Sequence, residues 1–378
     1  MRIAIVTETW PPEINGVALT VQSLAQGVAA LGHDVQVVRP RRPRDAEDGF
    51  ETLCLPGASL PRYPGLHFGL PAPRRLRQHW SERSPDAVYV ATEGPLGLSA
   101  VAAARRLGIP VCTGFHTRFD DFVHHYGFGF LTPAVFAYLR RFHNRADATL
   151  VPTTELHDFL RESGFRNVHL LRRAVDIDLF RPERHDRGLR AQWGLEDGDL
   201  AVLHVGRLAP EKNLELAVSA FRAIHARHPR ARFVMVGDGP ARAKLAEDHP
   251  DIVFTGMLRG EELARHYASG DLFLFPSLTE TFGNVTLEAL ASGVPVVAFD
   301  YGAAREHLLG ADAGTRVPPG NETAFVEAAV ALADRLRDAG ARARLRATAR
   351  AMVADLSAAD VARRFAELLG DLRMRSAA

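Results

Sequence analysis

Lysine is almost missing from this sequence. Of its 46 lysine and arginine residues, only Lys212 and Lys244 are lysines. The 46 basic and 45 acidic residues give a formal net charge of +1. A chain so close to neutral has no overall field that would favour nucleic acid or another polyanion. The scarcity therefore raises a question: which task at position 212 suits a compact ammonium group rather than a guanidinium?

Cysteine and long apolar runs are also scarce. Two thiols, Cys54 and Cys112, are too few for a disulfide framework or a cysteine-rich metal site, and we expect both to be buried thiols in a reducing compartment. No apolar run approaches the roughly 18 residues that span a bilayer. The N-terminal stretch MRIAIVTETWPP is too short for a signal peptide and is typical of a first strand. These absences predict a cytoplasmic protein.

Short, continuous β-branched runs alternate with longer amphipathic stretches along the chain. The runs lie at 2–8, 33–40, 87–92, 109–116, 148–153 and 167–172, and after a charged stretch at 200–208, 232–239, 252–257, 272–277 and 294–300. Runs that are apolar throughout indicate parallel strands buried on both faces. Alternation of strands with helices indicates doubly wound α/β domains.

The restart of this pattern predicts two domains, which a chain of 378 residues is long enough to form. We expect an α/β fold with a first Rossmann-like domain at residues 1–180 and a second at 181–357. The terminal amphipathic helix 358–376 is expected to pack back on the first domain. Two such domains facing each other create a deep cleft, which is the usual place for a ligand.

The string ETFGNVTLEAL places Glu280 and Glu288 on either side of a junction between a strand and a helix. Gly283 permits an unusual backbone at this junction, and Asn284 is a favourable N-cap residue. The N–H groups of a helix that starts at Asn284 and Val285 would face an anion. Carboxylates at the same edge are suitable acceptors for vicinal sugar hydroxyls.

This string resembles the Glu-seven-Glu motif of the retaining glycosyltransferases of family 4, which have the GT-B fold. VGRLAPEKNLELAVSAF, VMVGDGPAR, FTGML and YASGDLFLFPSLTETFG also follow the family's order and spacing, so the resemblance covers nearly the whole chain. In that family the first Glu hydrogen-bonds the transferred sugar, and the second holds the ribose hydroxyls of the nucleotide. The resemblance assigns these roles to Glu280 and Glu288.

The stretch GRLAPEKN gives a task to the rare lysine, because Arg207 and Lys212 flank a short turn between a strand and a helix. A guanidinium clasps phosphate oxygens in a bidentate way, whereas an ammonium group is a point charge that fits between two phosphates. The family uses this Arg and Lys to neutralise the diphosphate of a nucleotide sugar. The resemblance therefore implies a stabilised leaving group without a metal or other cofactor.

Backbone contacts complete the expected donor site. Gly16 follows the first strand and would let the main chain approach the donor phosphate. Gly237 and Gly239 in VGDGP would allow close approach of the nucleotide, since this string lacks the full dinucleotide motif. In the resembled family, the segment at Met257 and Leu258 lies against the base.

His116 ends the run IPVCTGFH and matches the family's His, which contacts the transferred sugar. The chain departs from the family at Ala174, where a glycine is usual. Alanine tolerates positive φ poorly, so either the turn is altered or the segment relaxes. This departure concerns the hinge between the domains more than the chemistry.

Segments 61–83 and 118–145 mix aromatic residues with arginine and histidine. They suit contact with an anionic membrane surface, a lid over an acceptor, or ordinary packing. The sequence pattern TEGPLG…GIPVCTGFHTRFDDFVHHYG is similar to that of the mannosyltransferase and sulfoquinovosyl-lipid branch of the family, whose acceptors are often glycolipids. Peripheral contact with the inner face of the membrane is therefore one expectation for these segments.

The resemblance implies a retaining hexosyltransferase that takes mannose from GDP-mannose and passes it to a lipid or glycan. A UDP-sugar donor, with glucose, galactose or sulfoquinovose passed to a diacylglycerol-type lipid, is the alternative. No second carboxylate is evident for a double displacement, so front-face attack with electrostatic stabilisation of the departing phosphate is expected.

Two other classes remain open. One is an epimerase or phosphorylase of the same fold, although neither lysine has a context suited to pyridoxal phosphate. The other is a non-catalytic nucleotide-sugar-binding protein. Such a protein would have no need for Glu280, Arg207 and His116 to occur together.

Overall fold

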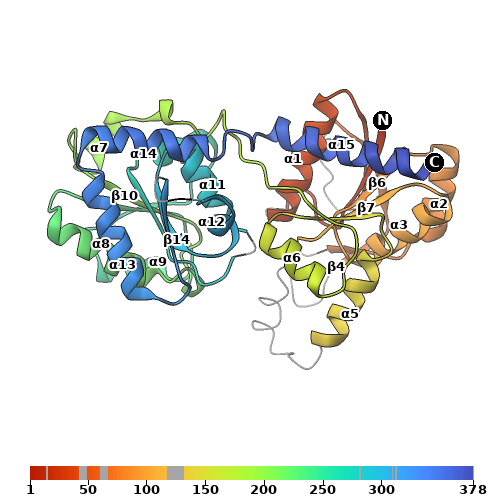
Figure 1. The fold of residues 1–378 in the computed structure, drawn as a ribbon, viewed down its shortest axis with the longest axis horizontal. Coiled ribbons are helices and arrows are strands. Elements are labelled where there is room, and N and C mark those ends of the chain that lie inside the picture. Colours follow the sequence, from red (N-terminus) through yellow and green to blue (C-terminus); the bar gives the residue numbers. More distant parts are fainter. Residues whose placement is uncertain are drawn as a thin grey trace. The chain divides into compact units, whose positions relative to one another are not determined.

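The computed structural model describes residues 1–13, 16–41, 49–59, 67–116, 132–280, 282–308, 310 and 313–377. The chain divides into a first unit, Met1–Ala174 with Ala358–Ala378, and a second unit, Val175–Ser357 (Figure 1). This division falls slightly before the expected boundary at 180, because Val175 and Phe180 belong to the hydrophobic core of the second unit.

The first unit is built on a parallel sheet with the strand order β3-β2-β1-β6-β7-β8-β9. Its strands are β1 (Arg2–Val6), β2 (Asp34–Pro40), β3 (Glu51–Leu55), β6 (Ala87–Val90), β7 (Val111–Gly114), β8 (Ala148–Val151) and β9 (Val168–Leu170). Its helices are α1 (Gly16–Ala30), α2 (Pro73–Glu82), α3 (Pro95–Arg106), α5 (Thr132–His143), α6 (Thr154–Glu162) and α15 (Ala358–Ala377). A short antiparallel pair, β4 (Gly57–Ser59) and β5 (His67–Gly69), accompanies the sheet.

The second unit repeats the plan with the strand order β12-β11-β10-β13-β14-β15. Its strands are β10 (Ala201–Val205), β11 (Arg232–Val236), β12 (Val253–Gly256), β13 (Leu272–Phe275), β14 (Val296–Phe299) and β15 (Gly314–Val317). Its helices are η2 (Pro182–Arg184), α7 (Arg187–Gln192), η3 (Pro210–Lys212), α8 (Leu214–Arg227), α9 (Arg242–Asp248), α10 (Gly260–Ala268), α11 (Asn284–Ala291), α12 (Gly302–His307), α13 (Glu322–Arg335) and α14 (Ala339–Ala351).

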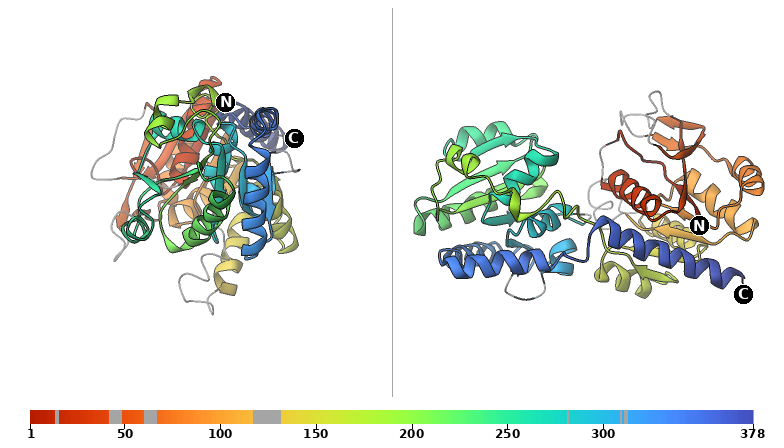
Figure 2. Two further views of the ribbon diagram at one scale, coloured as in Figure 1. Left: turned by 90° about the vertical axis from the view of Figure 1, so that its left-hand side faces the viewer. Right: turned by 90° about the horizontal axis from the view of Figure 1, so that it is seen from above.

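Both sheets are buried on two faces, as the continuous apolar runs predict. In β10, Leu203 packs with α10 and α11 on one face, whereas Val202 packs with α8 and α13 on the other. In β1, Ile5 packs with α1 and α15, and Ala4 packs with α2 and α3. Figure 2 shows the helical layers from two further directions. Burial of successive side chains on opposite faces is the reason that these strands are apolar throughout.

Helix α15 is part of the first unit although it ends the chain. It lies beside α1 in Figures 1 and 2, and Val361, Ala362, Phe365 and Leu369 bury their side chains in that unit's core. Gly27 of α1 allows this approach, because a Cβ built there would lie 2.5 Å from the Cβ of Ala362. The close packing joins the C-terminal segment to the sheet that carries His116.

The two cysteines differ in their surroundings. Cys112 in the interior strand β7 is fully buried, and burial raises the pKa of its thiol. Cys54 on the edge strand β3 is only partly buried, so the prediction of two buried thiols holds for one of them. Neither cysteine forms a disulfide bond.

Candidate active site

Lys212 and Glu280 meet at the carboxyl ends of β10 and β13. The Lys212 ammonium group forms an ion pair with the Glu280 carboxylate, and both side chains are mostly buried, at 14% and 18% exposure. The same ammonium group lies 6.0 Å from the centre of the Phe275 ring, within the range of a cation–π contact. Arg207 differs from Lys212, because its side chain is 67% exposed and its guanidinium lies 3.8 Å from the carboxylate of Glu211.

The loop that carries Glu280 is tied to the turn that carries Lys212. The Leu278 N–H donates to the carbonyl of Glu211 at 2.9 Å. The buried Ser277 hydroxyl lies 3.2 Å from Oε1 of Glu280, and the Tyr301 hydroxyl donates to the carbonyl of Ser277. Sequence reasoning missed Ser277 and Tyr301. The serine lies inside the string that carried the family resemblance, whereas the tyrosine lies beyond it.

Gly283, not Asn284, is the N-cap residue of α11. Gly283 adopts a left-handed conformation with φ +88°, and Asn284 is the first residue inside the helix. The predicted capping role of Asn284 is therefore wrong, because the turn after Phe282 needs positive φ one residue earlier, which only glycine adopts cheaply. The helix still begins at Asn284 and Val285, as expected.

Glu288 lies one turn into α11 and is held by a residue that the motif does not contain. The Tyr267 hydroxyl, from the buried end of α10, donates to Oε2 of Glu288 at 2.9 Å. Burial raises the pKa of the Glu288 carboxyl to about 7, although the hydrogen bond from Tyr267 acts in the opposite direction. Burial also raises the pKa of Tyr267, so it stays a hydroxyl donor. Near neutral pH this carboxyl gains and loses its proton readily.

The glycines of VGDGP allow the chain to approach itself. A Cβ at Gly237 would lie 1.9 Å from the carbonyl oxygen of Gly206, and a Cβ at Gly239 would lie 2.4 Å from that of Leu208. The Leu208 N–H also donates to the carbonyl of Asp238 at 2.9 Å. These glycines therefore hold the loop that leads to Lys212, a requirement that exists without any nucleotide.

Met257 and Leu258 follow β12 directly. The Met257 side chain is 63% exposed, whereas Leu258 is partly buried against the core of the second unit. Gly256, just before them, adopts φ +76° and accepts a hydrogen bond from the Gly237 N–H at 2.9 Å. This segment thus leaves one apolar side chain accessible, that of Met257.

In the first unit, His116 follows the carboxyl end of β7 and contacts Tyr89 of β6. The Tyr89 hydroxyl lies 2.9 Å from Nε2 of His116. Burial, together with the nearby charge of Arg173 and then His143, lowers the pKa of His116 to about 3. The imidazole is therefore neutral throughout the physiological range. Tyr89 and Arg173 were not predicted from the sequence.

Arg173 connects this histidine to the start of α1. Its buried guanidinium hydrogen-bonds the Thr20 hydroxyl and lies 3.4 Å from the carbonyl oxygen of Gly16. Gly16 is the first residue of α1, and a Cβ there would meet nothing within 4 Å inside the unit. Its neighbour Asn15 lies outside the described residues. The packing of the described part of the first unit therefore gives no reason for a glycine at position 16.

Ala174 resolves the departure that the sequence showed. Among the described residues other than glycine, positive φ occurs at Asn167 and Asn213 and not at Ala174. The segment has relaxed into a conformation that alanine accepts, and no backbone strain needs to be invoked there.

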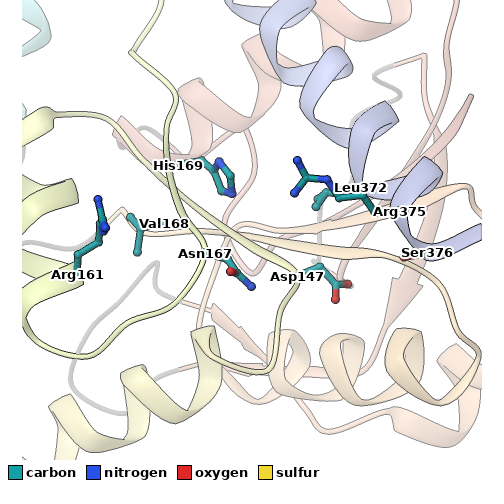
Figure 3. A pocket seen from close by; sticks show the side chains of 8 residues that line it. All are labelled: Asp147, Arg161, Asn167, Val168, His169, Leu372, Arg375 and Ser376. Carbon is teal, nitrogen blue, oxygen red and sulfur yellow. The ribbon is translucent and has the colours of Figure 1, made fainter. Parts of the chain in front are cut away.

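A pocket of about 510 Å³ lies at the amino ends of strands β8 and β9 in the first sheet (Figure 3). Asp147 and Asn167 line it just before β8 and β9, at the amino ends of the strands, whereas His116 follows a carboxyl end. Arg375 of α15 and His169 are also part of its wall. This pocket is separate from the residues that the motifs predicted.

Two features are absent from the described part of the chain. There, no group of three or more histidine, cysteine, aspartate or glutamate side chains is arranged to hold a metal ion. No helix among these residues has the length and apolar character needed to cross a membrane.

Comparison with known proteins matches both halves of the chain. The family model described as Glycosyltransferase Family 4 covers residues 14–179, and the model described as Glycosyl transferases group 1 covers residues 199–335. A GDP-mannose-dependent alpha-mannosyltransferase of Mycolicibacterium smegmatis is 40% identical over 313 residues, which are 81% of each chain. This protein belongs to glycosyltransferase family 4.

Other likenesses fit this assignment. A sulfoquinovosyl transferase of Arabidopsis thaliana is 32% identical over 307 residues, 79% of this chain and 59% of that protein. The structure of Anabaena HepE in complex with UDP covers 98% of this chain and 100% of its own, with a TM-score of 0.77 at 19% identity. The predicted α/β fold of the GT-B type is confirmed, and the protein is a hexosyltransferase that uses a nucleotide-sugar donor.

Proposed function

We propose that this protein transfers mannose from GDP-mannose to a lipid or glycan acceptor with retention of the α configuration. GDP-mannose-dependent alpha-mannosyltransferases of Mycolicibacterium smegmatis and Corynebacterium glutamicum are 40% and 37% identical to it. The sulfoquinovosyl transferase, at 32%, and an alpha-monoglucosyldiacylglycerol synthase of Streptococcus pneumoniae, at 29%, are less similar. A UDP-sugar donor with a diacylglycerol-type acceptor is therefore the second candidate.

One observation carries the donor site: the nearly buried ion pair of Lys212 and Glu280. An ion pair that is removed from water adds little to the stability of a protein. A role in binding therefore explains the presence of this pair better than a role in folding. A diphosphate that displaces the carboxylate would satisfy the ammonium group and free Glu280 for the transferred sugar. Arg207, exposed beside this pair, would clasp a phosphate as the donor arrives.

The other donor contacts follow from the same geometry. The carboxyl of Glu288, held by Tyr267, would accept hydrogen bonds from the ribose hydroxyls. The backbone at Gly16, Gly283 and Val285 would face phosphate oxygens, and the segment of Met257 and Leu258 would receive the base. His116 would contact the transferred sugar.

In the reaction, the bond between the anomeric carbon and the diphosphate oxygen breaks while the acceptor hydroxyl attacks from the same face. The departing phosphate takes the acceptor's proton, and Lys212 and Arg207 stabilise its negative charge. Charge stabilisation of this kind is commonly the largest contribution to catalysis. Side chains supply it here, so we expect transfer without a metal ion.

Peripheral binding to an anionic membrane belongs to the same proposal. Helix α5 exposes Val135 and Tyr138 and carries Arg140 and Arg141 in its last turn, a composition suited to a membrane surface. Residues 61–66 and 118–131 of the two predicted segments lie outside the described residues. In α2, Leu76 and Trp80 are buried in the core, so the part of segment 61–83 in that helix has a packing role. Flotation with anionic and neutral vesicles tests the proposal, and equal binding to both would contradict it.

A donor screen tests the function. Thermal shift and product formation are measured with GDP-mannose, UDP-glucose, UDP-galactose, UDP-N-acetylglucosamine and UDP-sulfoquinovose, with EDTA present and absent. We expect stabilisation by GDP-mannose, and in Lys212→Ala a loss of about 100- to 1,000-fold in transfer.

Lys244→Ala is the matched control for this variant. The Lys244 side chain is 79% exposed on α9 of the same unit and pairs loosely with Asp248 at 3.7 Å. A surface pair of this kind contributes little, so the control should keep full activity. Equal behaviour of the two lysine variants would contradict the donor site, and stabilisation by a UDP-sugar alone would favour the second candidate.

A further inference from the structure

Tyr89 is built into the first unit as a support for His116. Its ring is 1% exposed, and the Phe365 ring of α15 packs edge-on against it with centroids 4.9 Å apart. Its hydroxyl lies 2.9 Å from Nε2 of His116. Gly114 makes room for this contact, since a Cβ there would lie 2.2 Å from the hydroxyl oxygen and 2.6 Å from Nε2. The contact therefore depends on a strand, a glycine and the C-terminal helix together.

The direction of this hydrogen bond follows from the surroundings of the hydroxyl. A buried hydroxyl that donates to nothing is destabilising, because it has given up its hydrogen bond to water. Among the described residues, the hydroxyl of Tyr89 has His116 as its hydrogen-bond partner and no other acceptor. The tyrosine therefore donates to Nε2, and a neutral imidazole that accepts at Nε2 carries its own proton on Nδ1.

The opposite nitrogen of His116 is then a donor without an acceptor. Nδ1 is buried, and no residue in the described part of the chain hydrogen-bonds it. Arg173, held by the Thr20 hydroxyl and the carbonyl of Gly16, opposes a positive charge on the ring. What the unit presents is thus a neutral ring with one fixed N–H group.

We propose that Tyr89 is a positioning residue that keeps His116 in the Nδ1–H tautomer, so that this N–H donates to a hydroxyl of the transferred sugar. The inference rests on the proposed contact of His116 with that sugar. With the proton on Nε2 instead, Nδ1 would accept, and the Tyr89 hydroxyl would lose its acceptor. Phe365 extends the support to α15, which gives the terminal helix a part in transfer.

Kinetics of Tyr89→Phe test the consequence for transfer. The variant keeps the ring and removes the hydroxyl, so it should fold normally. We expect kcat to fall about 10-fold, because the variant loses one hydrogen bond, the one that orients the His116 ring. The KM for the donor should stay unchanged, because the substitution leaves Gly16 and the proposed phosphate and ribose contacts of the second unit in place. A loss confined to KM, or no loss, overturns the inference.

Two substitutions of the histidine separate its nitrogens. The amide nitrogen of asparagine sits one bond from Cγ, like Nδ1, whereas that of glutamine lies further out, like Nε2. We therefore expect His116→Asn to retain clearly more transfer than His116→Gln. The reverse order would place the working donor at Nε2 and overturn the inference.

Nitrogen NMR of histidine-labelled protein reports the tautomer directly. His204 in the second unit is an internal reference, because its Nδ1 lies 3.1 Å from the carbonyl of Leu274, which can only accept. In the wild type, His116 should show a protonated Nδ1 like His204, and Tyr89→Phe should change the signals of His116 alone. A wild-type His116 protonated on Nε2 overturns the inference. Absence of transfer by the wild type with every donor overturns the proposed function instead, and it is seen before any variant is made.

Discussion

The two units place their site residues at the same edge of similar sheets but equip them differently. In the second unit, Lys212 and Glu280 form an ion pair, and Glu288 has a pKa raised to about 7. In the first unit, His116 is neutral and hydrogen-bonded by Tyr89. The second unit can change its charge state when a charged donor arrives. The first unit presents groups of fixed protonation, which suits the recognition of uncharged sugar hydroxyls.

Among the variants considered, Gly237→Ala should have the largest effect, because it disturbs the loop that carries Lys212 in the second unit. The new Cβ would lie 1.9 Å from the carbonyl of Gly206, so the loop toward Lys212 must move. We expect a loss of about 3 kcal/mol in the free energy of unfolding and no stabilisation by any donor. Urea unfolding and thermal shift measure both.

Gly320→Ala is the control for backbone strain without a clash. Gly320 has φ +79° with nothing within 4 Å of a Cβ, so the expected cost is about 1 kcal/mol, and donor binding should persist. If the two variants lost stability equally and both bound donor, the close approach at Gly237 would not matter.

Donor binding should depend on pH through Glu288 and not through His116. The Glu288 carboxyl is protonated below about pH 7 in the donor-free unit, and an ionised carboxylate is the better acceptor for ribose hydroxyls. Donor affinity should therefore rise about 10-fold between pH 6 and pH 8, measured by calorimetry. The pKa of His116, lowered to about 3, keeps that group constant over this range.

The same proton affects stability with the opposite sign. The pKa of Glu288 is raised above its unfolded value of 4.5, so the folded unit binds the proton more tightly, and its stability falls as pH rises from about 4.5 to about 7. Glu288→Gln should remove this slope and flatten the pH dependence of donor affinity. Glu262→Gln, on the surface of α10, should change neither. A wild-type affinity that does not vary from pH 6 to pH 8 would contradict the role of Glu288.

Ala174→Gly should have the smallest effect. Because Ala174 does not adopt positive φ, a glycine relieves no strain and only adds freedom to the unfolded chain. We expect a loss of about 0.4–1 kcal/mol in the free energy of unfolding, measured by urea unfolding. A gain in stability would show that the alanine is strained and that the family's glycine turn persists.

Much of this protein could be predicted from local patterns. Both doubly wound sheets follow from their continuous apolar runs, because a strand buried on two faces must be apolar throughout. The edge strands β3 and β15 were missed, since each has partly exposed positions and no such run. Arg207, Lys212, Glu280 and Glu288 remain predicted donor-site residues, and the sequence points to them because they lie in two contiguous strings, each at the end of a strand.

What only the tertiary structure decided is which groups hold these residues. Tyr267 reaches Glu288 from α10, and Tyr89, Arg173 and Phe365 gather around His116 from β6, the end of β9 and the last helix. No spacing links such residues, because a parallel sheet brings strand ends together across long crossover connections. The sequence by itself determined the fold, the family and the charged residues of the motifs. Packing determined their protonation, because the pKa of a carboxyl or an imidazole depends on the burial and the neighbours that distant segments supply.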